Sequence, residues 1–270
     1  MHESLSPERA AYLRRLKRNK IMVNAVRAAL LIAFLGLWEL AGRLKWIDVL
    51  VFSCPSRVIS TLNSLWQSGD LLRHLGASCA ETAAGFLLGT MAGTLIAVLL
   101  WWSRTLSRIL EPYLVVLNAL PKTALGPIFI VWIGAGTESI IAMTLAISVF
   151  VTILNMHAAF CAVEEEKLRL MRAFGATKLQ TLRLLVLPAN SAALFNTLRV
   201  NVGLSWVGVI MGEFLVSKAG LGYLIVYGSQ VFNMDLVMAS VLLLAVAAVV
   251  MYEIVLLMER VMKARMGVTE

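Results

Sequence analysis

Charge, cysteine and histidine are all scarce in this sequence, and each shortage excludes a class of protein. Charged residues make up 15% of the 270 residues, against about 25% in a soluble domain, so the chain cannot supply a water-facing surface of its own. The three cysteines (Cys54, Cys79 and Cys161) form no C-x-x-C pair, and the three histidines have no carboxylates at metal-ligand spacing. We therefore expect no disulfide framework, no metal site and no cofactor.

The sequence is instead rich in long apolar runs. Hydrophobic residues make up 60% of the chain, its mean hydropathy is +0.83, and a helix needs about 20 mostly apolar residues to cross a bilayer. Six runs meet that length: 22–41, 78–102, 110–133, 138–160, 190–215 and 235–258. The sequence therefore predicts an all-α polytopic membrane protein with six transmembrane helices. We expect a cytoplasmic N-terminal segment at 1–21, a transmembrane domain at 22–262 with its core at about 74–258, and a cytoplasmic tail at 263–270.

Positive charge predicts the direction of these spans. The chain has 24 lysines and arginines against 16 acidic residues, a net charge of +8. With both termini inside, 16 of the 24 lie in inner segments, five in outer segments and three within spans. The positive-inside rule therefore places both termini in the cytoplasm. Because the basic residues lie in short patches between apolar runs and not along one face, we expect no nucleic-acid partner.

The third run contains groups that are costly in a lipid-facing helix. Pro121 and Pro127 interrupt it, and Lys122 lies beside the first proline. Proline has no backbone N–H to donate, and it disfavours helical structure in the residue before it. The carbonyls that lose their partners must then bond to another helix or to water in a cavity. A broken helix with a lysine at membrane depth indicates a polar pathway. A kink from which Lys122 extends to the membrane interface is an equally good interpretation.

Two other spans carry small or charged residues. The second span has Gly85, Gly89 and Gly93 at i, i+4 and i+8, a stripe that predicts a packing seam with another helix. In the fifth span, Arg199 and Glu213 lie fourteen positions apart, which is about 21 Å along a helix. They cannot pair with each other, so each must meet another helix, a second subunit or water.

The inner loop at 161–188 is longer than a connection between two spans requires. Residues 164–166 are all glutamate, which favours the first turn of a helix, and Leu168 and Met171 then begin an amphipathic face. Gly175 is expected to end this helix.

A second short helix is predicted directly afterwards. Thr177 and Gln180 have the spacing of a capping box, and Pro188 is expected to end the helix. Its apolar side is predicted to consist of Leu179, Leu182 and Val186. Such a helix pair can lie on lipid head groups, or it can be a rigid projection that a cytoplasmic partner binds and moves.

Several stretches of the sequence resemble the permease subunits of bacterial ABC importers. Gly175-Ala176, eight residues and then Leu185-Val186-Leu187-Pro188 are similar to the G-A-x8-[IL]-x-L-P part of their EAA loop. Residues 121–136 (PKTALGPIFIVWIGAG) resemble the P-x-x-A-x-x-P-L-x-x-x-W-F-G-x-G stretch of the nitrate, sulfonate and taurine branch. Three further stretches are similar to that branch: Cys54-Pro55-Ser56-Arg57-Val58, Gly212-Glu213-Phe214 and Gly220-Leu221-Gly222-Tyr223. The sequence departs from the loop pattern at Arg169, Leu170 and Met171, where Glu, Ala and Ala are usual.

The resemblance implies the type I ABC importer permease fold with a coupling helix pair, in a multi-pass protein of the bacterial inner (plasma) membrane. Such permeases pair in the membrane, usually as a homodimer, and each offers its loop to a cytoplasmic ABC ATPase subunit. An extracellular or lipid-anchored binding protein delivers the substrate, here a small anionic solute such as a sulfonate, nitrate or taurine. The chain has no G-x-x-x-x-G-K-[ST] loop to cradle ATP phosphates, so we expect it to be no enzyme, with ATP hydrolysis in a partner subunit.

The resemblance also assigns candidate site residues and a mechanism. We expect ATP-driven closure of the ATPase subunits to move residues 164–184, so that the spans open a central cavity outward and then inward. The predicted ATPase-coupling residues are Glu165, Arg169, Arg172, Phe174, Gly175, Ala176, Thr177, Leu187 and Pro188. The predicted translocation-pathway residues are Asn118, Pro121, Lys122, Pro127, Arg199, Ser205 and Glu213.

Two other functions are weaker interpretations of the same residues. An intramembrane enzyme could use Ser205 with His157. However, Gly203-Leu204-Ser205-Trp206 does not match G-x-S-x-G, and the sequence shows no oxyanion-hole motif. A passive channel gives no reason for the helix pair in the inner loop.

Overall fold

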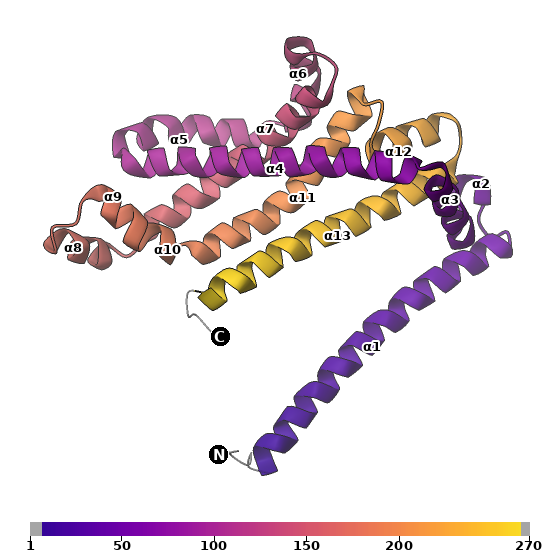
Figure 1. The fold of residues 1–270 in the computed structure, drawn as a ribbon, viewed down its shortest axis with the longest axis horizontal. Coiled ribbons are helices and arrows are strands. Elements are labelled where there is room, and N and C mark those ends of the chain that lie inside the picture. The colour runs from indigo at the N-terminus through magenta and orange to yellow at the C-terminus, as the bar shows by residue number, and fades with distance from the viewer. Residues whose placement is uncertain (1–6, 266–270) are drawn as a thin grey trace.

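The structure is a computed structural model that describes residues 7–265, and these residues form helices and no strand (Figure 1). The helices are α1 (Pro7–Arg43), α2 (Val49–Phe52), α3 (Pro55–Ser68), α4 (Asp70–Trp102), α5 (Arg104–Ala119), α6 (Gly126–Ile133), α7 (Thr137–Cys161), α8 (Glu165–Ala173), α9 (Lys178–Thr181), α10 (Leu187–Ala189), α11 (Ser191–Val216), α12 (Leu221–Gln230) and α13 (Met234–Arg265). A 3-10 turn, η1 (Lys122–Leu125), precedes α6, and a π turn, η2 (Leu182–Val186), joins α9 to α10. The all-α prediction is confirmed. The predicted terminal segments lie partly outside the described residues, at 1–6 and 266–270.

Within residues 7–265, five helices, α1, α4, α7, α11 and α13, are long and apolar enough to cross a membrane, and the bent pair of α5 with η1 and α6 makes a sixth if it is counted as one span. The last three of the five match the predicted spans at 138–160, 190–215 and 235–258, whereas α4 begins well before residue 78. α1 continues through the predicted N-terminal segment as far as Pro7, because the alanines, leucines, lysines and arginines before residue 22 are strong helix formers.

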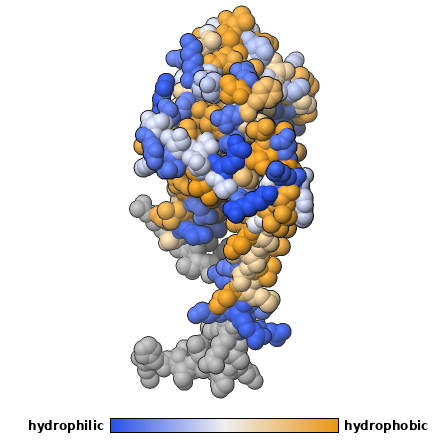
Figure 2. All heavy atoms as spheres, turned by 90° about the vertical axis from the view of Figure 1, so that its right-hand side faces the viewer, coloured by the Kyte–Doolittle hydropathy of each residue, from blue (hydrophilic) through white to orange (hydrophobic). Residues whose placement is uncertain are grey.

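α1 stands away from the rest of the body (Figure 1). In the apolar stretch of α1 at 17–43, no part of the most hydrophobic window is buried. The helix is attached near its end, where the Glu39 carboxylate accepts a hydrogen bond from the Ser56 backbone N–H (3.0 Å). Apolar side chains reach the surface beside polar ones on the view in Figure 2. A surface of this kind faces lipid or other chains more favourably than water.

The centre of the body is a seam in which α4 packs closely on α7. A Cβ atom at Gly85 would lie 2.4 Å from Thr144 Cγ2, and one at Gly93 would lie 2.5 Å from Thr152 Cβ. The hydroxyls of Thr144 and Thr152 donate to backbone carbonyls one turn earlier in α7, so they leave no unpaired polar group where the helices touch. The glycine stripe predicted as a packing seam is confirmed.

The third predicted span is broken at Pro121. α5 ends at Ala119, and η1 with α6 continues at 89° to it. Lys122 donates its Nζ to the Asn118 carbonyl oxygen (2.6 Å) and to Asn118 Oδ1 (3.2 Å), and so satisfies a carbonyl that the break leaves open. The prediction that Pro127 also interrupts the span is wrong, because Pro127 lies in the first turn of α6, where its missing N–H has no helical partner to lose.

The two ends of the body are named after the predicted orientation. The outer end holds Asp70, Val216 and Met234, and the inner end holds Trp102 and Ser191.

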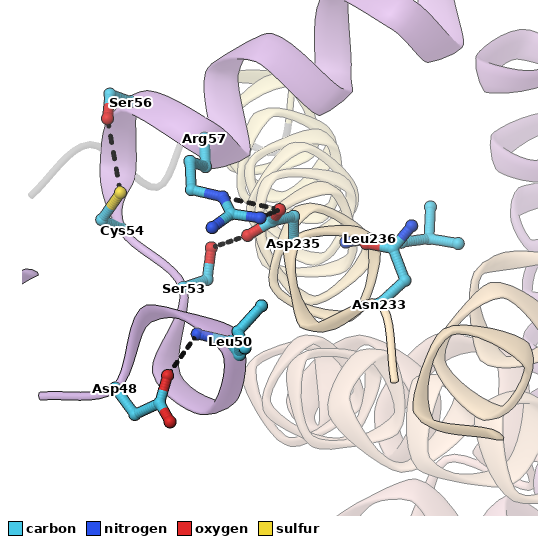
Figure 3. Close-up of polar contacts among 9 residues, drawn as sticks. All are labelled: Asp48, Leu50, Ser53, Cys54, Ser56, Arg57, Asn233, Asp235 and Leu236. Atoms are coloured by element: carbon cyan, nitrogen blue, oxygen red, sulfur yellow. Dashed lines mark hydrogen bonds and ion pairs between the residues drawn. The ribbon is translucent and has the colours of Figure 1, made fainter. Parts of the chain in front are cut away.

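At the outer end, the segment between α1 and α4 is attached to the start of α13 (Figure 3). The Asp235 carboxylate accepts a hydrogen bond from Ser53 Oγ (2.7 Å) and pairs with the Arg57 guanidinium (2.9 and 2.7 Å). The buried Ser53 has a φ of +54°, a conformation that persists only where side-chain contacts over-determine it.

Candidate functional site

At the inner end, residues 165–189 form the predicted helix pair. α8 ends at Ala173, and the chain turns at Gly175, whose φ is +73°, with the Ala176 N–H donating to the Met171 carbonyl oxygen (3.0 Å) across the turn. Glycine adopts this left-handed conformation without the steric cost of a Cβ. α9 begins in the predicted capping box, in which Thr177 Oγ1 accepts from the Gln180 N–H (3.3 Å) and Gln180 Oε1 accepts from the Thr177 N–H (2.7 Å). Both local predictions are confirmed.

The prediction that Pro188 ends the second helix is wrong. α9 continues through the π turn into α10, which contains Pro188, and the chain turns only at Asn190 before α11 begins. A proline ring normally collides with the carbonyl four residues earlier, here that of Leu184. We attribute its tolerance here to the wider π turn directly before it, which shifts the hydrogen bonding by one residue. The helix pair is therefore joined to α11 by an almost continuous helix.

Apolar side chains anchor the helix pair in the body. Leu182 and Val186 are buried and belong to one cluster with residues of α4 and α7, namely Ala97, Met156 and Phe160. Leu168 of α8 packs against the edge of this cluster. The prediction that Leu179 shares the packed side is wrong, since its side chain is 52% exposed. In the second helix, the anchoring side chains thus lie in η2.

Lys178 provides a second, polar link between the helix pair and α4. Its Nζ donates to the Trp102 carbonyl oxygen (2.5 Å) at the end of α4 and lies 5.7 and 5.5 Å from the ring centroids of Trp101 and Trp102. A cation at a helix C-terminus satisfies an open carbonyl and interacts favourably with the helix dipole. The two aromatic rings add a cation–π contact. The helix pair is therefore bonded to α4 as well as joined to α11.

The part of the helix pair that points away from this anchor is apolar and open. Phe174 is 80% exposed, Leu170 is 56% exposed and Leu184 is 70% exposed. The charged residues beside them pair on the surface, where Glu165 lies 3.6 Å from Arg169 and 3.2 Å from Arg172. Exposed apolar residues on a rigidly anchored projection are typical of a docking surface.

The structure places the nine predicted coupling residues on this one projection. Ala176 is half-buried, and the other eight are exposed: Glu165, Arg169, Arg172, Phe174, Gly175, Thr177, Leu187 and Pro188. Lys178, Leu182 and Val186 link the projection to the spans and are absent from the predicted set.

At the outer end, Glu213 occupies a space that glycines leave open. Its carboxylate is 2% exposed, and it accepts hydrogen bonds from Ser78 Oγ (2.5 Å) and from the Gly222 backbone N–H. A Cβ at Gly220 would lie 2.4 Å from this carboxylate, and one at Gly222 would lie 2.8 Å from it. The two stretches Gly212-Glu213-Phe214 and Gly220-Leu221-Gly222-Tyr223 are therefore two halves of one structural unit.

Two further backbone donors at the start of α12 are satisfied by α4. The Gly220 N–H donates to His74 Nδ1 (3.0 Å), and the Leu221 N–H donates to Ser78 Oγ (2.7 Å). We call this unit the Glu213 cradle, and it consists of His74, Ser78, Glu213, Gly220, Leu221 and Gly222. The cradle fixes α12 to α4 and α11 at the outer end, because each of its backbone donors at the helix start has a buried partner.

The predicted pathway residues do not form one cluster. Arg199 pairs with Glu259 of α13 near the inner end, whereas Glu213 lies in its cradle near the outer end. Each thus meets another helix, as predicted. Within residues 7–265, no hydrogen bond or ion pair joins these two residues to Lys122, which is bound to Asn118 at the break after α5.

The middle of α11 carries a polar residue that the sequence alone did not single out as a site. The buried Asn201 donates its Nδ2 to Thr90 Oγ1 of α4 (2.9 Å) and to Thr152 Oγ1 of α7 (2.7 Å). One turn further on, Ser205 is fully buried, and its Oγ has no hydrogen-bond partner among the described residues. The polar face of α11 is therefore turned toward α4 and α7.

The geometry also tests whether Ser205 and His157 can act together as an enzyme site. His157 Nε2 lies 3.1 Å from Ser107 Oγ and 3.5 Å from Cys161 Sγ. It makes no hydrogen bond to Ser205, so the described residues do not assemble the nucleophile–base pair that an intramembrane hydrolase requires.

Comparison with known proteins gives one consistent family. The family described as "Binding-protein-dependent transport system inner membrane component" matches residues 85–268. A permease named for aliphatic sulfonate transport, SsuC of Bacillus subtilis (strain 168), is 28% identical over 244 residues, or 90% of this chain and 87% of that one. The riboflavin transport system permease protein RibX of Chloroflexus aurantiacus is 26% identical and covers 86% of this chain and 87% of its own length. The taurine transport system permease protein TauC of Escherichia coli (strain K12) is 24% identical and covers 81% of each chain.

A solved structure supports the fold. A chain of the inward-facing MetNI methionine ABC transporter superposes with a TM-score of 0.65 and 19% identity, covering 76% of this chain and 98% of that one. The predicted type I ABC importer permease fold is confirmed.

Proposed function

The chain belongs to the family of binding-protein-dependent transport system inner membrane components and is a permease of an ABC importer, and on this premise we propose that it carries a small anionic solute. Sulfonate, taurine and nitrate are the expected class, and the relatives named for sulfonate and taurine transport support it. Lys122 supplies the positive charge in this proposal, because the hydrogen bonds it makes within the described residues are to the neutral oxygens of Asn118. Arg199 contributes less, since Glu259 neutralises it.

The helix pair is the proposed docking site for a cytoplasmic ABC ATPase subunit, which hydrolyses the ATP. The observation that carries this assignment is an apolar tip, 80% exposed at Phe174, on a projection whose base is buried in the body. Closure of the ATPase subunits moves residues 164–184. The buried cluster around Val186 and the Lys178–Trp102 bond pass this motion to α4, α7 and α11, which alternately open the pathway to each side.

The assembly proposed around this chain contains a second copy, two ATPase subunits and an extracellular binding protein, in the bacterial inner membrane with both termini in the cytoplasm. Exposed apolar side chains on α6, at Val131 (82%) and Trp132 (76%), and along α1 support packing against another chain or lipid. The pathway is proposed to run beside the break at Pro121, which lies next to Lys122.

Two exposed phenylalanines test the docking assignment. Phe174→Ala removes the tip of the helix pair without disturbing the body, whereas Phe232→Ala removes a side chain that is 85% exposed at the outer end. Truncation of an aromatic anchor in an interface typically costs about 2 kcal/mol or more, or about 30-fold in affinity. The affinity of the ATPase subunit for the full-length permease should therefore fall for Phe174→Ala, and uptake in proteoliposomes should fall with it, whereas this affinity should stay unchanged for Phe232→Ala. Equal affinities of the two variants would exclude this docking site.

The proposed substrate class has its own test. In proteoliposomes supplied with the binding protein and ATPase, Lys122→Gln should raise the concentration of anionic solute needed for half-maximal uptake, and Lys122→Arg should largely restore it. Lys122 also bonds to Asn118 near the end of α5. The thermal unfolding temperature of both variants therefore shows whether loss of this contact destabilises the protein. If Lys122→Gln transports as the wild type does, Lys122 does not attract the substrate.

A further inference from the structure

A cleft at the inner end has no ligand assigned to it by the proposed mechanism, although coupling residues line it. It lies between the helix pair and the turn that joins α4 to α5, two features at the same end of the body (Figure 1). Its volume is about 360 Å³, which is in the range of small-ligand sites. The side chains that matter for its chemistry are Trp101, Arg104, Glu165, Arg172 and Lys178.

The charge of this cleft favours an anion. Three cations, Arg104, Arg172 and Lys178, line it together with one carboxylate, Glu165. Glu165 is already held by Arg172 (3.2 Å) and by a fourth cation outside the cleft. Arg104 has no ion pair within the described residues, and Lys178 donates its hydrogen bond to a neutral carbonyl. Arginine forks and a lysine ammonium are the groups that recognise phosphate oxygens.

The position of the cleft indicates where the anion comes from. Trp101 and Trp102 end the span α4, and paired aromatic residues at the end of a span mark the head-group level of a bilayer. The neighbouring turns of α4 and α5 expose apolar side chains, with Leu99 58% and Ile109 56% exposed. An acyl chain can lie along such side chains while its phosphate reaches the cations, whereas a soluble anion makes no use of them.

We propose that this cleft binds the phosphate head group of an anionic phospholipid in the cytoplasmic leaflet. Basic pockets between transmembrane helices on the cytoplasmic side are sites of this kind. The inference rests on the proposed orientation, which puts the inner end in the cytoplasm. The head group would touch both the helix pair, through Arg172 and Lys178, and the start of α5, through Arg104. It would thereby stiffen the connection through which the ATPase moves the spans.

Lipid titration of the purified full-length permease in detergent, read by native mass spectrometry, tests this site. The probes are phosphatidylglycerol, phosphatidylcholine with the same acyl chains, and inorganic phosphate as a competitor. Phosphatidylglycerol should bind more tightly than phosphatidylcholine, and millimolar phosphate should not displace it. Each lysine or arginine near a membrane surface contributes about 1 kcal/mol toward anionic lipid, so Arg104→Gln should weaken phosphatidylglycerol binding about fivefold.

The matched control is Arg108→Gln, which removes the same charge one turn further along α5 at an exposed position outside the cleft. Its affinity for phosphatidylglycerol should equal that of the wild type. Equal binding of the two lipids, or an equal loss in both arginine variants, would overturn the proposal. Displacement by phosphate would assign the cleft to a soluble anion instead. Because no ATPase or binding protein is present, a negative result here is distinct from a failure of the proposed transport function.

Discussion

The polar side chains of the Glu213 cradle are buried at the outer end of the helical body, whereas the ion pairs of the helix pair are exposed at its inner end. At the outer end, the Glu213 cradle buries His74, Ser78 and Glu213, which are 6%, 0% and 2% exposed, and each makes a hydrogen bond. At the inner end, the ion pairs of Glu165 lie on a surface where its side chain is 55% exposed. The apolar tip at Phe174 is open as well. The outer end is thus built to hold one geometry, and the inner end leaves a surface for another chain.

The energetic consequences of this difference are large. A buried donor or acceptor that loses its partner costs about 1–3 kcal/mol, whereas an exposed ion pair contributes about 0–1 kcal/mol. Changes in the Glu213 cradle should therefore act on folding, and changes in the helix pair should act on partner binding and transport.

The largest effect is expected for Gly220→Ala. The new Cβ would lie 2.4 Å from the Glu213 carboxylate, in a backbone with a φ of +115°. With a ψ of 169° this backbone lies in a region almost restricted to glycine, which costs a residue with a Cβ about 1–3 kcal/mol, and displacing the carboxylate strands two buried donors at about 1–3 kcal/mol each. The unfolding temperature in detergent should fall by many degrees or the protein should fail to accumulate. Gly203→Ala is the control, because nothing lies within 4 Å of its Cβ, and it should unfold like the wild type.

A smaller effect is expected for Gly175→Ala in the helix pair. This glycine also has a positive φ, +73°, but nothing lies within 4 Å of a Cβ built there. The cost is therefore limited to about 1–2 kcal/mol of local backbone strain. The unfolding temperature of the body should change little, while affinity for the ATPase subunit should fall about tenfold because Phe174 is adjacent to the distorted turn. A loss of global stability as large as that of Gly220→Ala would contradict the contrast between the two ends.

Lys178→Met tests the polar link between the helix pair and α4. The change removes the hydrogen bond to the Trp102 carbonyl oxygen and keeps an apolar stem of similar length. The expected loss of stability is about 1 kcal/mol, and ATP hydrolysis should become less responsive to the loaded binding protein. Lys167→Met is the matched control, since within the described residues Lys167 pairs with the exposed Glu164. If the two lysine variants behave alike, Lys178 does not transmit motion to α4.

The smallest effect is expected for Arg169→Gln. Arg169 is exposed and lies 3.6 Å from Glu165 in a helical i,i+4 pair, which is worth about 0.3–0.5 kcal/mol. The unfolding temperature should shift by less than about 1 °C in a chain of this size. A shift as large as that of Lys178→Met would show that the surface pairs of the helix pair also support the body.

The elements that the sequence predicts well are those that depend on neighbours along the chain. Apolar length is enough to predict α7, α11 and α13, and the turn at Gly175 with the capping box at Thr177 follows from residues a few positions apart. The continuation through Pro188 depends on a π turn, which has no apolar periodicity of its own.

The contacts that the sequence could not predict join residues far apart in the chain. Ser78 and Glu213 are 135 positions apart, and Ser53 and Asp235 are 182 apart. A serine within an apolar run gives no signal of its partner, because the pairing is created only when the helices pack. The sequence around Gly220 and Gly222 resembles a family motif. Only the fold shows why glycines stand there, because the Glu213 carboxylate occupies the space that a Cβ would need.

Photo-crosslinking from the two exposed phenylalanines tests the central claim most directly. A photoreactive benzoylphenylalanine replaces Phe174 in one full-length variant and Phe232 in another, and each is irradiated in membranes that also contain the ATPase subunit and the binding protein. The ATPase subunit should be captured from position 174 and not from position 232. Capture of the ATPase from position 232, or its absence at position 174 in a complex that still transports, would contradict the assignment of the helix pair as the coupling surface.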